Sequence, residues 1–422
     1  MLELDPQAVE SGRHNDDSGR PALPDGRPSG DWRLAGAAVR ALPAPLAVLD
    51  RQSLSANAGS LLRRAGGKPI RVASKSIRCR DVLRAVLATE GFSGILAYTL
   101  AEGLWLADEF DDVVVAYPTA DDAALRLLAA DPALLGRVTV MVDSAEQLVW
   151  MESVLRDVNA AGRIRLCIDL DVGWRPGGGP HIGVRRSPVR TPEEAADLAA
   201  EIARRRGFLL VGLMGYEAHV AGLGDQPLNP ARAAAVKAMQ SRSMQELTVR
   251  RQAAVAAVSR LADLEFVNGG GTGSLELSSR DDSLTELAAG SGLFGPATFD
   301  RYSRFRPAPA AAFALPVVRR PAPDTVVVLG GGWIASGPPG RDRLPTPVHP
   351  PGLRYLSAEA AGEVQTPLQG SVAATLSIGE KVWFRHAKSG ELCEHVDSLL
   401  LLDSGEVRGE LPTYRGEGKA FL

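Results

Sequence analysis

The sequence contains few cysteines, no excess of basic residues and no long apolar run. Its 422 residues include three cysteines and carry a formal net charge of -3. Three widely spaced thiols do not form a disulfide framework, which indicates a reducing compartment. Without a basic excess, neither nucleic acid nor an anionic membrane is an expected partner. No stretch is apolar enough to span a bilayer and the first residues do not follow the plan of a signal peptide, so we expect a cytoplasmic protein.

The composition predicts a globular chain with two folded parts. With 45% hydrophobic and 23% charged residues, the chain is long enough for one large domain and a smaller one. Residues 1–30 are rich in Asp, Gly, Pro, Ser and Arg and are expected to form a disordered tail. Residues 31–300 are assigned to the large domain. Residues 301–422 have proline-rich connections and short β-like runs, which predict a second, mostly β domain.

Short apolar runs alternate with helix-length segments through the large domain. The runs expected to be strands are 45–49, 70–73, 94–98, 113–117, 138–142, 164–168, 208–213 and 264–267. Apolar strands without alternation are buried on both faces, which is typical of parallel strands joined by helices. Eight such units predict a closed (β/α)8 barrel of the TIM type. The alternative is an open doubly wound sheet, but no early glycine-rich turn of the dinucleotide type is present.

Candidate catalytic residues follow the predicted strands. In a parallel barrel the active site lies at the carboxyl ends of the strands. Lys75, Arg175, Tyr216 and His219 each come shortly after one of the apolar runs. Taken singly, a lysine that closes a strand is usually solvated, and the other three side chains are more often structural. Together they indicate one site at one end of the barrel.

Two glycine-rich segments follow the late strands. The loop at 269–274 combines four glycines with Thr272 and Ser274, and a second loop lies at 289–292. Loops of this kind offer backbone N–H groups to a compact anion such as phosphate. No lysine follows the first loop, which excludes the nucleotide P-loop pattern. A phosphate site together with Lys75 matches the chemistry of pyridoxal phosphate, which a lysine holds through a Schiff base.

Five ordered segments carry a resemblance to a known family. They are the segments at 71–76, 169–177, 215–219, 269–273 and 286–291, which read RVASKS, DLDVGWRPG, GYEAH, GGGTG and ELAAGS. With them the chain resembles the pyridoxal-phosphate enzymes of the alanine-racemase fold, also called fold type III. Within that fold it is similar to the D-threonine aldolase and D-serine dehydratase group. The resemblance covers roughly residues 40 to 420.

The resemblance implies a set of roles for these residues. Lys75 would form the internal aldimine with the cofactor, and Arg175 would face the cofactor's phenolic oxygen. Tyr216 and His219 would position cofactor or substrate. The phosphate would be bound by the two glycine loops, through Gly270, Gly271, Thr272, Gly290 and Ser291. The resemblance also implies a homodimer whose site is completed by the β domain.

Two departures from the racemase pattern bear on the reaction. Racemases of this fold have an arginine before the second phosphate loop and a tyrosine from the partner subunit as a second base. Here Ala288 stands at the place of the arginine, and no matching tyrosine motif begins the β domain. Racemisation needs proton exchange on both faces of the α-carbon, so these absences favour a reaction on one face, an elimination or a retro-aldol cleavage.

The resemblance also implies a divalent metal, zinc or manganese, in the β domain. The group carries a His-x-Asp or His-x-Cys metal pair there. In this chain His386 is present, but Lys388 stands where the second metal ligand, Asp or Cys, would be expected. A protonated lysine is no metal ligand. Either Cys393 or Glu391 completes the site with His386, or Lys388 replaces the ion as electrophile.

These observations predict a pyridoxal-phosphate lyase that acts on a small β-hydroxy D-amino acid, by dehydration with deamination or by retro-aldol cleavage. The residues expected to be catalytic are Lys75, Tyr216, His219, His386 and Lys388. The alternatives are an amino-acid racemase and a non-catalytic pyridoxal-phosphate-binding protein. Such carriers generally lack a second β domain.

Overall fold

The structure is a computed structural model that describes residues 2–26, 28–226 and 229–422. The chain forms two compact units. The first, which we call the barrel unit, comprises Leu62–Ser74, Thr89–Gly290 and Phe421–Leu422; the second, the sheet unit, comprises Met1–Leu61, Lys75–Ala88 and Ser291–Ala420. Among the described residues, no helix has both the length and the apolar character needed to cross a bilayer.

The barrel unit is built on eight parallel strands that close on themselves, as the sequence predicted. The strands are β2 (Ile70–Ala73), β3 (Phe92–Ala97), β4 (Val113–Val115), β5 (Val138–Val142), β6 (Ile164–Asp169), β7 (Phe208–Gly215), β8 (Phe266–Gly269) and β9 (Glu286–Ala289). Pairing of Ile70 with Leu287 joins β2 to β9 and closes the barrel. An apolar cluster within it includes Val114, Met141 and Phe266, and the guanidinium of Arg71, which is paired with Glu286, lies over the ring of Phe266.

One strand of the expected barrel belongs to the other unit. The run predicted at 45–49 forms β1 (Leu46–Asp50), which pairs antiparallel with β10 and parallel with β16 in the sheet unit. The eighth barrel strand is β9, a segment that the sequence analysis interpreted only as the approach to a phosphate loop. The sequence of a short apolar strand does not show which strand it will pair with, because strand pairing depends on residues far away in the chain.

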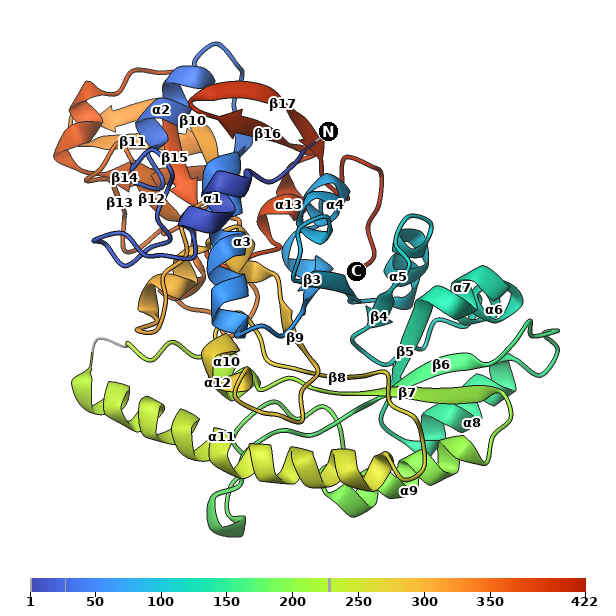
Figure 1. Ribbon diagram of the computed structural model, residues 1–422. Helices are drawn as coiled ribbons and strands as arrows, with labels where there is room; N and C mark the ends of the chain where they lie inside the picture. Colours follow the sequence, from blue (N-terminus) through green and yellow to red (C-terminus); the bar gives the residue numbers. More distant parts are fainter. Residues whose placement is uncertain (1, 27, 227–228) are drawn as a thin grey trace. The chain divides into compact units, whose positions relative to one another are not determined.

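Helices connect the barrel strands, and the longest of them is α11 (Pro230–Val258). The others of this region are α5 (Leu100–Ala107), α6 (Asp122–Ala130), α7 (Pro132–Arg137), α8 (Ala145–Val154), α9 (Pro192–Ala203), α10 (Ala218–Ala221) and α12 (Leu275–Ser278). α9 begins with a capping box in which Thr191 and Glu194 bond to each other's backbone N–H. α9 and α11 pack side by side (Figure 1).

The sheet unit contains a nine-stranded sheet among the described residues. Besides β1, its strands are β10 (Ala311–Ala322), β11 (Thr325–Leu329), β12 (Thr346–His349), β13 (Arg354–Tyr355), β14 (Gln365–Gln369), β15 (Lys381–Arg385), β16 (Ser398–Asp403) and β17 (Glu406–Pro412). Its helices are α1 (Pro6–Ser11), α2 (Trp32–Ala38), the first part of α3 (Arg51–Ala65), α4 (Arg80–Leu87) and α13 (Leu392–His395). Trp32 of α2 stacks on Trp383 of β15, with ring centroids 6.0 Å apart, and anchors α2 to the sheet.

Residues 2–26 and 28–30 differ from the expected disordered tail. Asp5 caps α1, and Leu2, Leu4 and Ala8 are buried. Gly59 of α3 lies so close to the backbone of Val9 that a side chain would not fit between them. This stretch is mostly polar, but it contains a few well-spaced apolar residues. Burial of these residues is enough to pack it against the rest of the sheet unit.

Candidate functional site

Lys75 follows the last residue of β2 by two positions. β2 is buried along its whole length, and the hydroxyl of Ser74 donates to the carbonyl oxygen of Leu96 in β3 at 3.2 Å. Lys75 itself is half-buried in the 3-10 turn Ser74–Ser76. The chain therefore presents this lysine where the sequence predicted it, at the carboxyl end of a barrel strand.

The second glycine loop makes a close approach to the end of β2. A Cβ atom at Gly290 would lie 2.5 Å from the carbonyl oxygen of Ala73, so only glycine fits there. Because β9 pairs with β2, the loop after β9 lies beside Ala73, the last residue of β2, within the barrel unit.

The first glycine loop is held by its own chain. Gly270 has a φ of +80°, and its N–H donates to Glu217 at 2.7 Å. The N–H of Gly271 donates to the hydroxyl of Ser274 at 3.1 Å. Both amides therefore already have acceptors, a difference from the expectation that they point to a phosphate. The loop passes over Tyr216, because a Cβ at Gly271 would lie 2.9 Å from that ring.

A buried charge network that the sequence analysis missed supports this loop. Arg251 of α11 lies between Glu217, to which it donates a hydrogen bond, and Asp281, whose carboxylate accepts at 2.8 Å. All three side chains are almost completely buried. Glu217 thus joins the guanidinium of Arg251 to the amide of Gly270. No sequence pattern pairs a mid-helix arginine with carboxylates about 30 residues away.

Tyr216 and His219 are both predicted site residues at the end of β7. Burial raises the pKa of Tyr216 to about 12, so the phenol keeps its proton at neutral pH. Nε2 of His219 shares a hydrogen bond with the hydroxyl of Ser243, and burial lowers the pKa of His219. The barrel unit therefore presents one neutral phenol and one neutral imidazole at this strand end.

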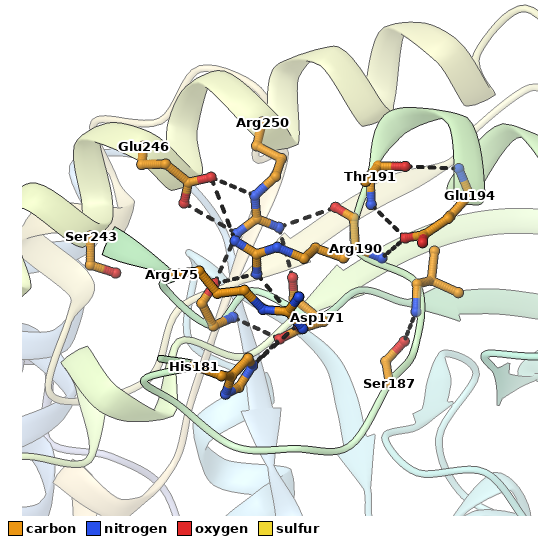
Figure 2. Close-up of polar contacts among 12 residues, drawn as sticks. Asp171, Arg175, His181, Ser187, Arg190, Thr191, Glu194, Ser243, Glu246 and Arg250 are labelled. Atoms are coloured by element: carbon orange, nitrogen blue, oxygen red, sulfur yellow. Dashed lines mark hydrogen bonds and ion pairs between the residues drawn. The ribbon is translucent and has the colours of Figure 1, made fainter. Parts of the chain in front are cut away.

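Asp171, shortly after β6, is the centre of a polar cluster (Figure 2). Its carboxylate accepts from the N–H of Gly173 at 2.9 Å and lies 3.0 Å from Nε2 of His181. Arg190 approaches it at 3.4 Å. Burial alone would raise the pKa of Asp171, but the hydrogen bonds from His181 and Gly173 outweigh it and hold this pKa below its usual range.

His181, which the sequence analysis missed, is the buried partner in this cluster, and Arg175 is the exposed one. The side chain of Arg175 is 46% exposed and reaches Asp171 at only 3.8 Å, whereas that of His181 is 5% exposed. The other ring nitrogen of His181 is buried and has no hydrogen-bond partner among the described residues. Ten residues separate His181 from Asp171, and no local spacing indicates the contact.

A pair of carboxyl groups lies at the ends of β5 and β6. Burial, with the neighbouring charge of Asp143, raises the pKa of Asp169 to about 7. The guanidinium of Arg186 lies over the ring of Tyr117, 5.5 Å from its centroid, and its charge opposes this shift. The mouth of the barrel thus holds a carboxyl group that titrates near neutral pH.

In the sheet unit, the turn between β15 and α13 packs on Lys75. A Cβ at Gly390 would lie 2.5 Å from the carbonyl oxygen of Lys75, and Gly390 has a φ of +109°. The hydroxyl of Ser389 donates to the carbonyl oxygen of Ser291 at 2.9 Å. The structure therefore brings this turn together with two predicted site residues, Lys75 and Ser291.

The same turn carries an ammonium group and a carboxyl group. Nζ of Lys388 donates to the carbonyl oxygen of Ser336 at 3.0 Å, and its backbone N–H donates to Glu391 at 2.6 Å. Burial lowers the pKa of Lys388, and the positive charges of Arg343 and Lys75 act in the same direction. Burial raises the pKa of Glu391 to about 7. Lys388 and Lys75 are thus close enough to influence each other's charge.

The residues expected to bind a metal are enclosed. His386 is 1% exposed, its ring meets Phe294 edge-on, and neither ring nitrogen has a hydrogen-bond partner among the described residues. Burial lowers its pKa to about 3 and raises that of Cys393 well above its usual range. Within residues 2–26, 28–226 and 229–422, no group of three or more His, Cys, Asp or Glu side chains is arranged to hold a metal ion.

The family model for the alanine racemase N-terminal domain matches residues 49–297. A D-threonine aldolase from Arthrobacter sp is 24% identical over 302 residues, 68% of this chain and 71% of that protein. The structure of D-threonine aldolase from Filomicrobium marinum aligns with a TM-score of 0.74 at 21% identity, covering 89% of this chain and 96% of that one.

D-threo-3-hydroxyaspartate dehydratase from Delftia sp. HT23 aligns with a TM-score of 0.65 at 18% identity, covering 89% of this chain and 98% of that one. At these identities the two structures show a shared fold. The family model covers more than half of the sequence, from β1 through β9. The chain therefore belongs to the family defined by the alanine racemase N-terminal domain.

Proposed function

We propose that this protein is a pyridoxal-phosphate-dependent lyase of small β-hydroxy D-amino acids, in which Lys75 anchors the cofactor. The observation that carries the proposal is the combination at the end of β2. A half-buried lysine follows a fully buried strand, and Gly290 approaches the backbone of Ala73 so closely that a Cβ would not fit.

The residues present suit the cofactor. The loops containing Gly271 and Gly290 lie so close to neighbouring protein atoms that a Cβ would not fit at either glycine, and small-residue loops after late barrel strands are suited to a phosphate. Glu217 and Arg251 hold the first of these loops in shape. Thr272 and Ser291 would add hydroxyl groups to the phosphate site. Bound pyridoxal phosphate would supply the electron sink that makes the α-proton of an amino acid removable.

The protein's own residues would carry the protons and hold the substrate. The amine of Lys75, once released from the cofactor, would take the α-proton on one face. Tyr216, which keeps its phenolic proton, and His219, held by Ser243, would orient cofactor or substrate. Arg175 was expected to face the phenolic oxygen of the cofactor; His181, buried beside Asp171, is the better held candidate for that place.

The substrate class follows from the relatives named above. One is a D-threonine aldolase and another a D-threo-3-hydroxyaspartate dehydratase, so both act on D-amino acids with a hydroxyl group on the β-carbon. Ala288 supports the same choice over racemisation. It lies in the apolar cluster within the barrel, where it offers no charge to a pyridine nitrogen.

We also propose a cytoplasmic homodimer. Three free, buried cysteines suit a reducing compartment. Light scattering of the purified protein tests the dimer, with a mass near twice 44.6 kDa expected.

The function is tested by spectrum and product. The purified protein is expected to absorb visible light when loaded with pyridoxal phosphate, and Lys75→Ala is expected to lose that band. D-serine and D-threonine should then yield an oxo acid with ammonia, or glycine with an aldehyde. A protein that stays colourless with the cofactor contradicts the proposal, and loss of optical activity from D-alanine without new products would identify a racemase instead.

A further inference from the structure

The turn between β15 and α13 raises a question about the metal that the resemblance implies. An acidic or thiol ligand would be expected two residues after His386. Lys388 stands there, and a protonated amine repels a divalent cation instead of binding it. The donor set is therefore one neutral imidazole and one ammonium group, which does not fit a divalent metal.

His386 is also poorly placed to be a ligand. Its side chain is enclosed, with its ring edge-on to Phe294 at 6.5 Å between centroids. Its carbonyl oxygen accepts from the N–H of Ala297 at 3.0 Å, which fixes the backbone. An ion could reach the ring only if these neighbours moved.

Of the two substitute ligands, one is engaged in the turn and the other is buried. The carboxylate of Glu391 accepts from the backbone N–H of Lys388 at 2.6 Å and closes the turn. Cys393 is 2% exposed within α13. Glu391 cannot join His386 without dismantling the turn that packs on Lys75, and Cys393 forms no group of three or more metal ligands with its neighbours among the described residues.

The ammonium of Lys388, by contrast, is held in place. It donates to the carbonyl oxygen of Ser336 at 3.0 Å, and an ammonium has two further protons to donate. In the two residues that follow it, Ser389 bonds to Ser291 and Gly390 packs against the backbone of Lys75. The turn therefore fixes a positive proton donor relative to the lysine that would anchor the cofactor.

We propose that Lys388 replaces the metal: its ammonium binds the β-hydroxyl of the substrate and protonates it as it leaves, in an elimination that needs no divalent cation. The inference rests on the proposed lyase function and selects one of its two branches. Aldol cleavage must remove the proton of the β-hydroxyl, which an ammonium cannot accept, whereas loss of water needs a proton on the leaving oxygen, which an ammonium supplies.

The elimination is balanced in atoms and protons. The α-proton passes to the amine of Lys75, the Cβ–O bond breaks, and the oxygen takes a proton from Lys388 to leave as water. The unsaturated amine that remains adds one water and releases an oxo acid and ammonia. Lys75 gives up its proton through solvent, and Lys388 regains one, so both lysines return to their starting states.

The test combines metal content, spectrum and product for the cofactor-loaded protein. Elemental analysis is expected to find zinc and manganese well below one ion per chain, and dialysis against a chelator should leave the rate unchanged. D-serine and D-threonine are expected to give oxo acid and ammonia, with no glycine. Lys388→Met should lower this rate by about 100-fold or more while the visible band remains.

Matched variants separate this role from a structural one. Nζ of Lys381 also donates to a backbone carbonyl oxygen, that of Arg40, at 3.0 Å, so Lys381→Met is the control and should keep the wild-type rate. Lys388→Arg keeps the charge with a weaker acid and should retain the band with a reduced rate. The melting temperature of each variant shows that it is folded.

Three results would overturn the inference while leaving the lyase function intact: stoichiometric metal whose removal stops turnover, glycine and aldehyde as the products, or wild-type activity in Lys388→Met. A wild type that never gains the visible band would instead overturn the proposed function.

Discussion

Arg251 in the barrel unit and His386 in the sheet unit are both completely enclosed, but their surroundings differ in kind. Arg251 lies between two carboxylates, and one of these holds the amide of Gly270. His386 meets an aromatic ring, and neither of its nitrogens has a partner among the described residues. A buried charge needs its partners, whereas a buried neutral ring can be exchanged for an apolar one.

The difference shows that buried polar side chains have different roles in the two units. In the barrel unit, enclosed charges give a loop its shape. In the sheet unit, the enclosed imidazole meets Phe294, and the charge that we propose to be active is on Lys388, in the turn that follows His386. Four variants test this contrast.

Arg251→Met is expected to have the largest effect. It leaves Glu217 and Asp281 buried without their cation, which costs about 3–5 kcal/mol of the free energy of unfolding. Urea unfolding measures the loss, and weaker binding of pyridoxal phosphate should accompany it because the loop at Gly270 loses its support. Arg242→Met, exposed on the same helix, is the control and should change little.

Asp169→Asn tests the raised pKa of the carboxyl group at the end of β6. The pKa of Asp169 is about 7 in the folded protein and near 3.8 when unfolded, so the wild type loses stability as pH rises between these values. Asparagine stays neutral, so the free energy of unfolding of the variant should rise relative to that of the wild type by up to about 4 kcal/mol between pH 4 and 7. Urea unfolding across this range measures it, and an advantage that shrinks with rising pH would contradict it.

Gly390→Ala tests the contact of the turn with Lys75. The added Cβ meets a backbone oxygen at a φ of +109°, so we expect a loss of about 1–3 kcal/mol and slower turnover as the turn shifts. Gly136→Ala is the control, because that glycine lies in α7 with nothing within 4 Å of its Cβ position. It should be neutral or stabilising.

His386→Leu should have the smallest effect. Because the buried nitrogens lack partners, an apolar side chain of similar size is expected to change the free energy of unfolding by no more than about 1 kcal/mol, in either direction. Turnover should persist. A large loss of activity in a folded variant would show that His386 binds a metal or substrate after all.

Much of the site could be predicted from short segments of sequence. Lys75 after a buried run and the two glycine loops are local patterns, because a strand end and a tight turn are specified by neighbouring residues. The roles proposed for Lys75 and Ser291 stay predictions until the spectrum is measured. Arg175 was singled out on the same basis, but its 46% exposed side chain makes it peripheral to Asp171.

What the sequence by itself determined was the type of fold and the lysine: a closed barrel of parallel strands joined by helices, and one amine after the buried run at 70–73. The tertiary structure decided which eight strands close the barrel, moving β1 to the sheet and bringing in β9. It also decided that His181 is the buried partner of Asp171, and that Arg251 supports the loop at Gly270. The reason is physical: turns and strand ends depend on adjacent residues, whereas strand pairing and buried charge pairs join residues that the chain separates widely.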